Sequence, residues 1–190
     1  IATIFRRSPL VFVSLADSGI DSPDDFLGRV AAVEGGDGVL PLEAMLSNLD
    51  LDFHQIEIVP YDYSYASLYA GDADITSSYS TAGLLRIRRA GYEVNLIWPG
   101  DYGVHLYSDT LITSDQMIAK NPDLVTRFLR ATLRGWHEAI EEPETAVEIT
   151  LSYAKDTDLE LQTEMMEAQI LLIQTGEYQI GWMRAEVWQG

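Results

Sequence analysis

The chain has 190 residues, of which 47% are hydrophobic, so it carries enough apolar material to bury a core rather than remain disordered. Its formal net charge of −18 at pH 7 repels nucleic acids and anionic lipid surfaces, and we expect neither as a partner. The absence of cysteine excludes disulfides, thiolate metal sites and a cysteine nucleophile, and no apolar run reaches the roughly 20 residues that span a bilayer.

The first half of the chain alternates short apolar runs with helical patterns. Strands are predicted over 29–33, 55–59, 73–78 and 92–98, and helices over 41–49, 64–69 and 81–90. The last two helices are followed by Gly71 and Gly91, which are typical stop signals. This β-α-β-α-β-α-β order predicts an open, doubly wound α/β sheet with right-handed crossovers.

The second half of the chain is predicted to be helical, over 113–119, 122–141, 143–154 and 158–175. Thr113 with Gln116, and Thr157 with Glu160, have the spacing of a capping box. Asn121-Pro122 is an N-cap followed by proline at the first helical position. The long helix carries one apolar stripe, which predicts packing on a core. The stripe consists of Val125, Phe128, Leu129, Leu133, Trp136 and Ile140.

Several stretches of the chain resemble one known family. They are DYGVHLYSDTL at 101–111, NPDLVTRFLRATLRGWHEAIEEPETAVEI at 121–149, RRSPLVFVSLADSGIDSPDDFLGRVAAVEGG at 6–36 and IGWMRAEVW at 180–188. They resemble the NMT1/THI5-like group of periplasmic solute-binding proteins, which implies a type II periplasmic binding protein fold. Because members of that group open with part of their first lobe, we expect a complete α/β second lobe at 12–103. Residues 1–11 and 104–190 would then form hinge crossings and a partial, mainly helical first lobe.

The same resemblance implies a function outside the cytoplasm, as a periplasmic or extracellular domain that is lipid-anchored or soluble. Such a domain captures a small polar or heterocyclic solute, such as a thiamine-pyrimidine precursor, and its partner is an ABC permease. The alternative is an extracellular sensor domain, joined in the same chain to a histidine kinase or cyclase. A helical layer without its sheet also predicts a homodimer formed through the partial lobe.

Enzymatic activity is not expected. Fungal relatives that make the thiamine pyrimidine use pyridoxal phosphate and a cysteine-rich segment, and this chain has no cysteine. His54, His105 and His137 are scattered, and the chain has no P-loop, no G-x-S-x-G and no H-E-x-x-H motif. We therefore predict neither a cofactor nor a metal.

The first candidate ligand-binding segment follows the strand at 29–33. It consists of Glu34, Gly35, Gly36 and Asp37. Glycine lets the backbone approach a ligand closely, and its amides receive anionic or carbonyl oxygens. The alternative is an ordinary turn between a strand and a helix.

The second candidate segment lies at the end of the strand at 73–78. It consists of Ser77, Ser78, Tyr79, Ser80 and Thr81. Alternatively, Ser80 or Thr81 caps the helix that follows. The stretch SYSTAG lacks the bulky aromatic and Glu-Pro pair of pyrimidine binders, which argues against a thiamine-pyrimidine ligand.

Tyrosines and a crossing segment complete the candidates. Tyr61 and Tyr63 have flat rings with polar tips, which suit the wall of a cleft for a planar ligand. Tyr65 and Tyr69 have the i, i+4 spacing typical of core packing. Asp101-Tyr102 lies where the chain is expected to cross between lobes, and Asp101 would accept hydrogen bonds from a ligand or lock the hinge.

Overall fold

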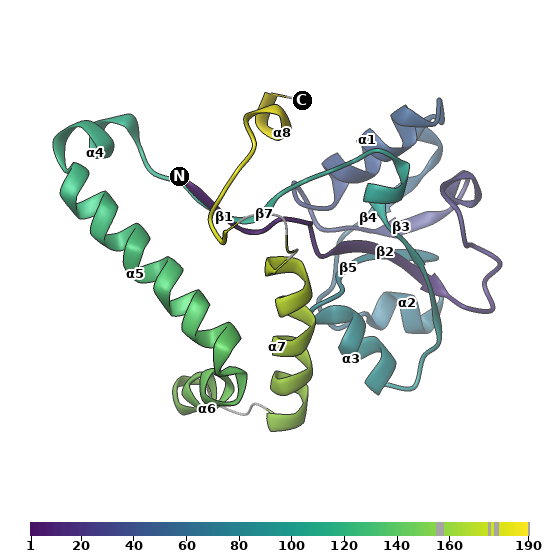
Figure 1. Ribbon diagram of the computed structural model, residues 1–190. Helices are drawn as coiled ribbons and strands as arrows, with labels where there is room; N and C mark the ends of the chain where they lie inside the picture. The colour runs from purple at the N-terminus through teal and green to yellow at the C-terminus, as the bar shows by residue number, and fades with distance from the viewer. Residues whose placement is uncertain (155–157, 175, 177–178, 190) are drawn as a thin grey trace. The chain divides into compact units, whose positions relative to one another are not determined.

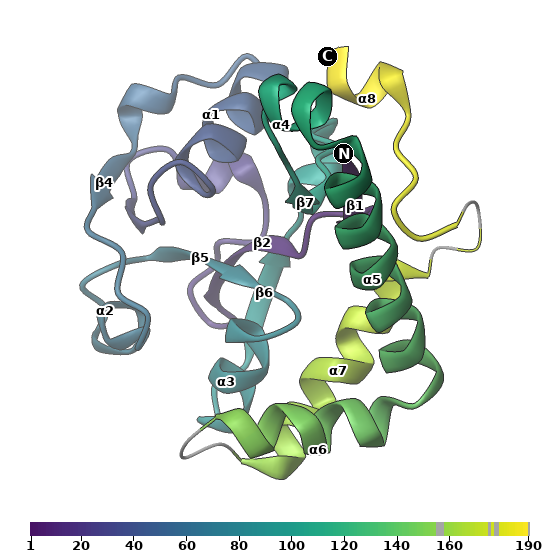
Figure 2. The ribbon, with the colours of Figure 1, turned by 90° about the vertical axis from the view of Figure 1, so that its left-hand side faces the viewer.

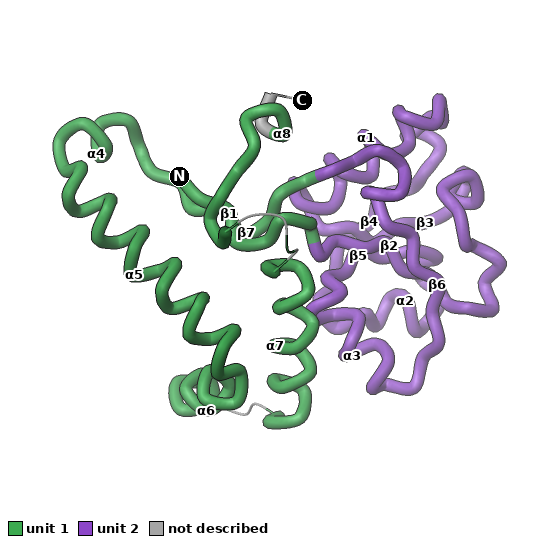
Figure 3. Tube along the Cα trace, viewed as in Figure 1, with its two compact units in different colours: residues 1–8, 106–190 green, residues 9–105 purple. Residues whose placement is uncertain are grey.

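The computed structural model describes residues 1–154, 158–174, 176 and 179–189, and the chain divides into two compact units (Figure 3). Unit 1 consists of residues 1–8 and 106–190, and unit 2 of residues 9–105. Unit 2 is therefore one continuous segment placed inside the sequence of unit 1. The assignment of these units to the lobes of a binding protein stays a prediction.

Unit 2 is built on a five-stranded sheet with the order β4-β3-β5-β2-β6 (Figure 1). Strands β4 (Glu57–Val59) and β5 (Ile75–Tyr79) both run parallel to β3 (Val30–Ala32). Strand β2 (Leu10–Leu15) runs antiparallel to β5 and to β6 (Val94–Ile97), and lies between them. The four predicted strands are confirmed, whereas β2 was not predicted.

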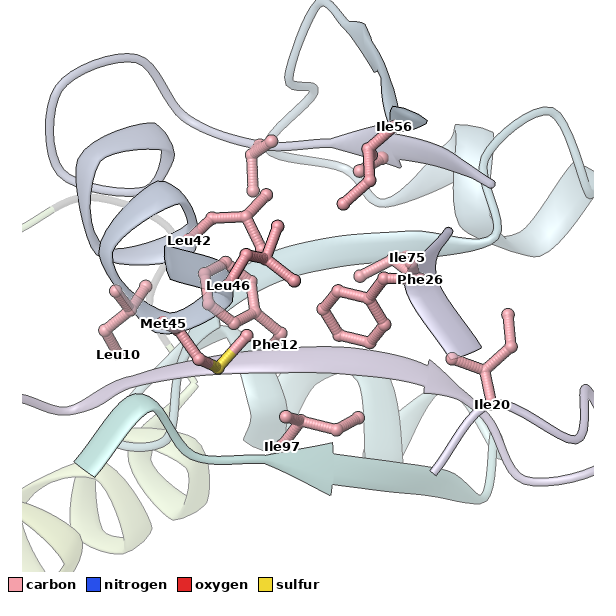
Figure 4. Close-up of a cluster of buried hydrophobic side chains, with 12 residues drawn as sticks. Leu10, Phe12, Ile20, Phe26, Leu42, Met45, Leu46, Ile56, Ile75 and Ile97 are labelled. Carbon is pink, nitrogen blue, oxygen red and sulfur yellow. The ribbon is translucent and has the colours of Figure 1, made fainter. Parts of the chain in front are cut away.

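Helices cover both faces of this sheet (Figure 2). Helix α1 (Val39–Asn48) lies on one face, and α2 (Ala66–Ala70) and α3 (Gly83–Arg89) lie on the other. Because neighbouring strand residues point to opposite faces, Phe12 packs with Leu42 and Leu46 of α1 (Figure 4), whereas Val13 packs with Leu68 of α2. The predicted doubly wound α/β architecture is confirmed.

Three short 3₁₀ turns connect these elements: η1 (Pro23–Phe26), η2 (Phe53–Gln55) and η3 (Pro99–Tyr102). In η1, Asp25 accepts a hydrogen bond from the Ser22 N–H at 3.1 Å. Gly28 ends this turn with a φ of 77°, a conformation that glycine adopts without strain.

Unit 1 contains a strand pair and helices. Strands β1 (Ala2–Phe5) and β7 (Ser108–Leu111) are antiparallel and were not predicted. The helices are α4 (Asp115–Lys120), α5 (Pro122–Glu141), α6 (Pro143–Tyr153), α7 (Leu159–Ile173) and α8 (Ala185–Gln189). The first four match the predicted helices within two residues, apart from Thr175, which lies outside the described residues. Within the described residues, no helix combines the length and apolar character needed to cross a membrane.

The N-terminal cap of α4 differs from the prediction. The capping box of Thr113 with Gln116 is wrong, because α4 begins one residue later than that box requires. Ser114 is the N-cap, and its hydroxyl accepts a hydrogen bond from the Met117 N–H at 3.1 Å.

The other predicted caps fare differently. Asn121 and Pro122 stand at the N-cap and first position of α5 as predicted, although the Asn121 side chain makes no capping hydrogen bond. Thr157 lies outside the described residues. The described N-cap of α7 is Asp158, whose carboxylate accepts hydrogen bonds from the N–H groups of Glu160 and Leu161.

The apolar stripe of α5 is buried only toward the end of the helix. Ile140 is buried, Trp136 is half-buried with its ring edge-on to Phe5, and Phe128 is 59% exposed. The core of unit 1 is formed by β1, α6, α7 and the second half of α5. The first half of α5 therefore presents apolar side chains to solvent.

Candidate ligand-binding site

The carboxyl ends of β3 and β5 mark the point where the strand order reverses. From β3 the chain passes through α1 to β4 on one side, and then through α2 to β5 on the other side of β3. In open α/β sheets, ligands bind outside the carboxyl ends of the strands at such a point. The loops concerned are 33–38 and 80–82, with 60–65 following β4 at the same edge.

The loop after β3 is held in place by hydrogen bonds of the Glu34 backbone. The Glu34 N–H donates to Ser77 Oγ at 3.0 Å, and the Glu34 carbonyl oxygen accepts from the N–H groups of Gly38 and Val39 at 3.0 and 3.1 Å. The amides of Gly38 and Val39 are therefore committed to the first turn of α1. The predicted residues Gly35, Gly36 and Asp37 form the exposed tip of this loop.

Two predicted tyrosines lie beside this loop. Tyr63 Oη donates a hydrogen bond to Glu34 Oε1 at 2.6 Å, and the Tyr63 ring stands edge-on to Tyr61 with a centroid distance of 4.8 Å. Tyr63 is 75% exposed and Tyr61 is half-buried. The structure thus brings Glu34, Tyr61 and Tyr63 together, which are predicted site residues from two different loops.

Tyr65, expected only to pack in the core, links these tyrosines to β5. Its side chain is 5% exposed, its Oη accepts from Tyr61 Oη at 3.3 Å, and it shares a hydrogen bond of 3.1 Å with Ser78 Oγ. Tyr65 has a φ of 59°, a left-handed conformation that costs a non-glycine residue on the order of 1 kcal/mol or more. Such strain persists where the surroundings fix the residue, and it clusters at functional sites.

The serine-rich end of β5 supports the candidate site through hydrogen bonds. Ser77, Ser78 and Thr81 are buried, and Ser77 and Ser78 support Glu34 and Tyr65 through the hydrogen bonds above. Tyr79 and Ser80 are partly buried. The alternative that Ser80 or Thr81 caps the next helix is wrong, because the N-cap of α3 is Ala82, which makes no side-chain capping bond.

Gly83, at the start of α3, was not singled out in the sequence. A Cβ at this position would lie 1.8 Å from Tyr65 Oη and 2.3 Å from Ser78 Oγ. Only glycine leaves room for this hydrogen-bonded pair. A glycine opening a predicted helix, where better helix formers are usual, was the available signal.

Asp101 and Tyr102 lie elsewhere in unit 2. Both belong to η3, where the Tyr102 carbonyl oxygen accepts from Asn48 Nδ2 at 3.0 Å. Asn48 is the last residue of α1, about 15 Å along the helix from its start beside Glu34. The structure therefore does not bring Asp101 and Tyr102 to the Glu34–Tyr63 cluster, and their binding role stays a prediction.

The electrostatics of the cluster keep its phenols neutral. Burial raises the pKa of Tyr61, and the hydrogen bond with Tyr65 and the charge of Glu34 raise it further. The hydrogen bond to Glu34 raises the pKa of Tyr63. The site thus presents a carboxylate acceptor beside neutral phenols and ring faces, which suits binding of a polar planar molecule. Across the described residues, no group of three or more His, Asp or Glu side chains is arranged to hold a metal ion.

A cavity of about 400 Å³ lies among α5, α6 and α7 of unit 1. Its lining mixes apolar and uncharged polar side chains, and contains none of the predicted site residues. It is lined by Thr132, Gly135, Trp136, Ala139, Ala146, Val147, Thr150, Gln162, Met166 and Gln169.

Solved structures of similar fold identify the fold class. A protein from Bordetella bronchiseptica RB50 aligns with a TM-score of 0.73 at 12% identity, over 98% of this chain and 62% of its own. The periplasmic aliphatic sulphonate binding protein SsuA from Escherichia coli aligns with a TM-score of 0.65 at 15% identity, over 98% of this chain and 59% of its own. At such identities the likeness assigns the fold alone, which is that of type II periplasmic binding proteins.

The sequence assigns the family. The NMT1/THI5 like family profile matches residues 1–146, and the chain belongs to that family. The riboflavin-binding protein RibY of Chloroflexus aurantiacus is 23% identical, over 99% of this chain and 56% of its own. The formylaminopyrimidine-binding protein of Halalkalibacterium halodurans is 26% identical, over 88% of this chain and 52% of its own. The chain thus spans about half the length of these curated relatives.

Proposed function

We propose that this chain is part of an extracytoplasmic solute-binding protein that delivers a small planar ligand to an ABC importer. The observation that carries the proposal is the cluster of Glu34, Tyr61 and Tyr63 at the strand-order reversal of unit 2. Membership of the NMT1/THI5-like family supports it. We take unit 2 as the second lobe, and unit 1 as hinge crossings and part of the first.

The ligand class follows from the chemistry of the cluster. An exposed tyrosine ring beside a carboxylate suits stacking on a flat heterocycle whose polar edge makes hydrogen bonds. Riboflavin and formylaminopyrimidine, for which the two relatives are named, are both flat nitrogen heterocycles. Such a role requires binding without turnover. A ligand that contacts both lobes binds the closed form more tightly than the open form, and this difference in affinity shifts the protein toward the closed form.

Direct binding measurements test this proposal. Riboflavin and formylaminopyrimidine would each be titrated into the purified chain by calorimetry, and riboflavin also by its own fluorescence. We expect at least one to bind, and Tyr63→Ala to weaken it about tenfold, because an aromatic contact contributes about 1 kcal/mol beyond its buried area.

Tyr153→Ala is the matched control, because Tyr153 is 88% exposed on α6 of unit 1 and should leave binding unchanged. If a ligand binds wild type and Tyr63→Ala with equal affinity, it binds away from this cluster and the proposed site is refuted.

A further inference from the structure

The charges in the loops around the Glu34–Tyr63 cluster, at the carboxyl edge of the unit 2 sheet, are all of one sign. The loops 33–38, 60–65 and 80–82 follow β3, β4 and β5. They contain Glu34, Asp37 and Asp62, and neither lysine nor arginine. Every residue of these loops is described in the structure.

The cations of unit 2 lie away from this edge. Unit 2 contains no lysine and four arginines. Arg29 precedes β3, at the opposite edge of the sheet, and pairs with Asp74 at 3.7 Å. The others, Arg86, Arg88 and Arg89, lie in α3, which runs from the carboxyl edge back toward the opposite edge. An anionic group in this site would therefore meet carboxylates with no unit 2 cation in these loops, whereas Arg6 and Arg7, which precede β2 in the sequence, belong to unit 1.

Glu34 supplies a specific acceptor within this negative surface. Its backbone is fixed by Ser77, and its side chain is held by the hydrogen bond from Tyr63. A carboxylate has two acceptor oxygens and room for several donors, so a ligand N–H can join Tyr63 on the same group. Hydrogen bonds to an ionised acceptor are about twice as strong as neutral ones.

We infer that Glu34 and the acidic loops select neutral or cationic heterocycles that carry N–H donors, and reject sulfonated or phosphorylated solutes. The inference rests on the proposed function and narrows its ligand class. It separates this chain from its structural neighbour named for binding aliphatic sulphonates, with which it shares the fold. Discrimination arises because a like charge near Glu34 is repelled, while an N–H donor gains a charge-assisted hydrogen bond.

A matched pair of ligands tests the inference on the unaltered chain. Riboflavin and riboflavin 5′-phosphate share the flat ring and differ in one phosphate group. We expect riboflavin, titrated in 0.15 M NaCl, to bind at least about tenfold more tightly than the phosphate ester, because one extra repulsion of about 1.4 kcal/mol gives that factor. The ratio should fall in 1 M NaCl, where the Debye length shrinks to about 3 Å. An alkanesulfonate should not bind at millimolar concentration.

The variant Glu34→Gln keeps the shape of the side chain and removes its charge. It should weaken riboflavin about tenfold or more, since hydrogen bonds to charged groups contribute more than neutral ones, and should reduce the preference over the phosphate ester. Glu43→Gln is the control, because Glu43 is exposed on α1 outside these loops and should change neither affinity. Thermal unfolding of both variants would confirm that they fold.

The outcomes separate the two proposals. If the phosphate ester or the sulfonate binds as tightly as riboflavin, or if Glu34→Gln alters neither ratio nor affinity, the charge selection is wrong while the binding function stands. If riboflavin, formylaminopyrimidine and both anions all fail to bind, the proposed function fails and the selection fails with it.

Discussion

Replacing Gly83 with alanine tests whether the packing beneath the candidate site is as tight as the structure indicates. The new Cβ would lie 1.8 Å from Tyr65 Oη, 2.3 Å from Ser78 Oγ and 2.8 Å from Tyr65 Cζ. Tyr65 is only 5% exposed, so its ring cannot turn out into solvent without leaving the core. The Tyr65–Ser78 hydrogen bond must break or the start of α3 must shift.

The magnitude follows from three contributions. Forcing an extra carbon into a packed interior costs about 1–3 kcal/mol, and losing the hydrogen bond about 1 kcal/mol more. The better helix propensity of alanine offsets up to about 1 kcal/mol of this loss. The net loss in the free energy of unfolding is about 2 kcal/mol, which lowers Tm by roughly 4–8 °C in a chain of this size.

Urea and thermal unfolding, followed by tyrosine and tryptophan fluorescence, measure this loss. Gly35→Ala is the matched control, because a Cβ there meets no atom within 4 Å and stability should change by less than about 0.5 kcal/mol. Tyr65→Phe removes the nearest clashing atom, so Gly83→Ala should cost about 1 kcal/mol less in that background. The packing argument fails if Gly83→Ala is as stable as wild type, or if its cost is the same with Phe at position 65.

Three further predictions concern the first turn of α2, a helix glycine and the net charge. Asp62→Ala should cost about 1 kcal/mol, because the Asp62 carboxylate accepts from the N–H groups of Ala66 and Ser67. Hydrogen bonds from the Ser64 and Ser67 side chains hold the pKa of Asp62 below its ordinary value. The difference in unfolding free energy between Asp62→Ala and wild type should therefore be constant above about pH 4 and shrink as the pH falls further. A difference that grew in acid would contradict this argument. Gly135→Ala should raise the unfolding free energy by about 0.5–1 kcal/mol in urea titrations, because a Cβ in the middle of α5 meets nothing within 4 Å; a loss of stability would mean an unseen contact. With a net charge of −18, Tm should rise between 0.05 and 1 M NaCl as self-repulsion is screened, and a flat or falling Tm would count against that repulsion.

The elements of unit 2 that could be predicted are those with local signals. Hydrophobic periodicity and the glycines after α2 and α3 located four strands and three helices. Strand β2 was missed because its run, Leu10–Leu15, is a short continuous apolar segment whose identity as a strand depends on pairing with β5 and β6 far along the chain. Strands β1 and β7 were missed for the same reason, since each is four residues long and pairs with the other across more than 100 residues of sequence.

The candidate site shows the same limit. The segments that contain Glu34, Tyr61 and Tyr63 could be predicted, because residues after strand ends meet at one edge of a sheet. The part played by Tyr65 was missed, because its i, i+4 spacing with Tyr69 is also the pattern of a core residue. The hydrogen bond of Tyr65 to Ser78 and the space that Gly83 leaves for Tyr65 have no local signature in the sequence. Both depend on how α2 and α3 pack on one face of the sheet.

The pairing of β1 with β7 has a consequence for the order in which this chain folds. Thr3 Oγ1 donates to the Ser108 carbonyl oxygen, 105 positions later, and all of unit 2 lies between the two strands. Closing a loop of that length in an unfolded chain is entropically costly, whereas β3, β4 and β5 within unit 2 are joined by short crossovers. Unit 2 also places β2 directly beside β6, so its collapse draws the flanking segments together. We therefore expect unit 2 to form first in refolding, with the β1–β7 pair appearing in a later phase. During synthesis, β1 leaves the ribosome long before its partner strand exists.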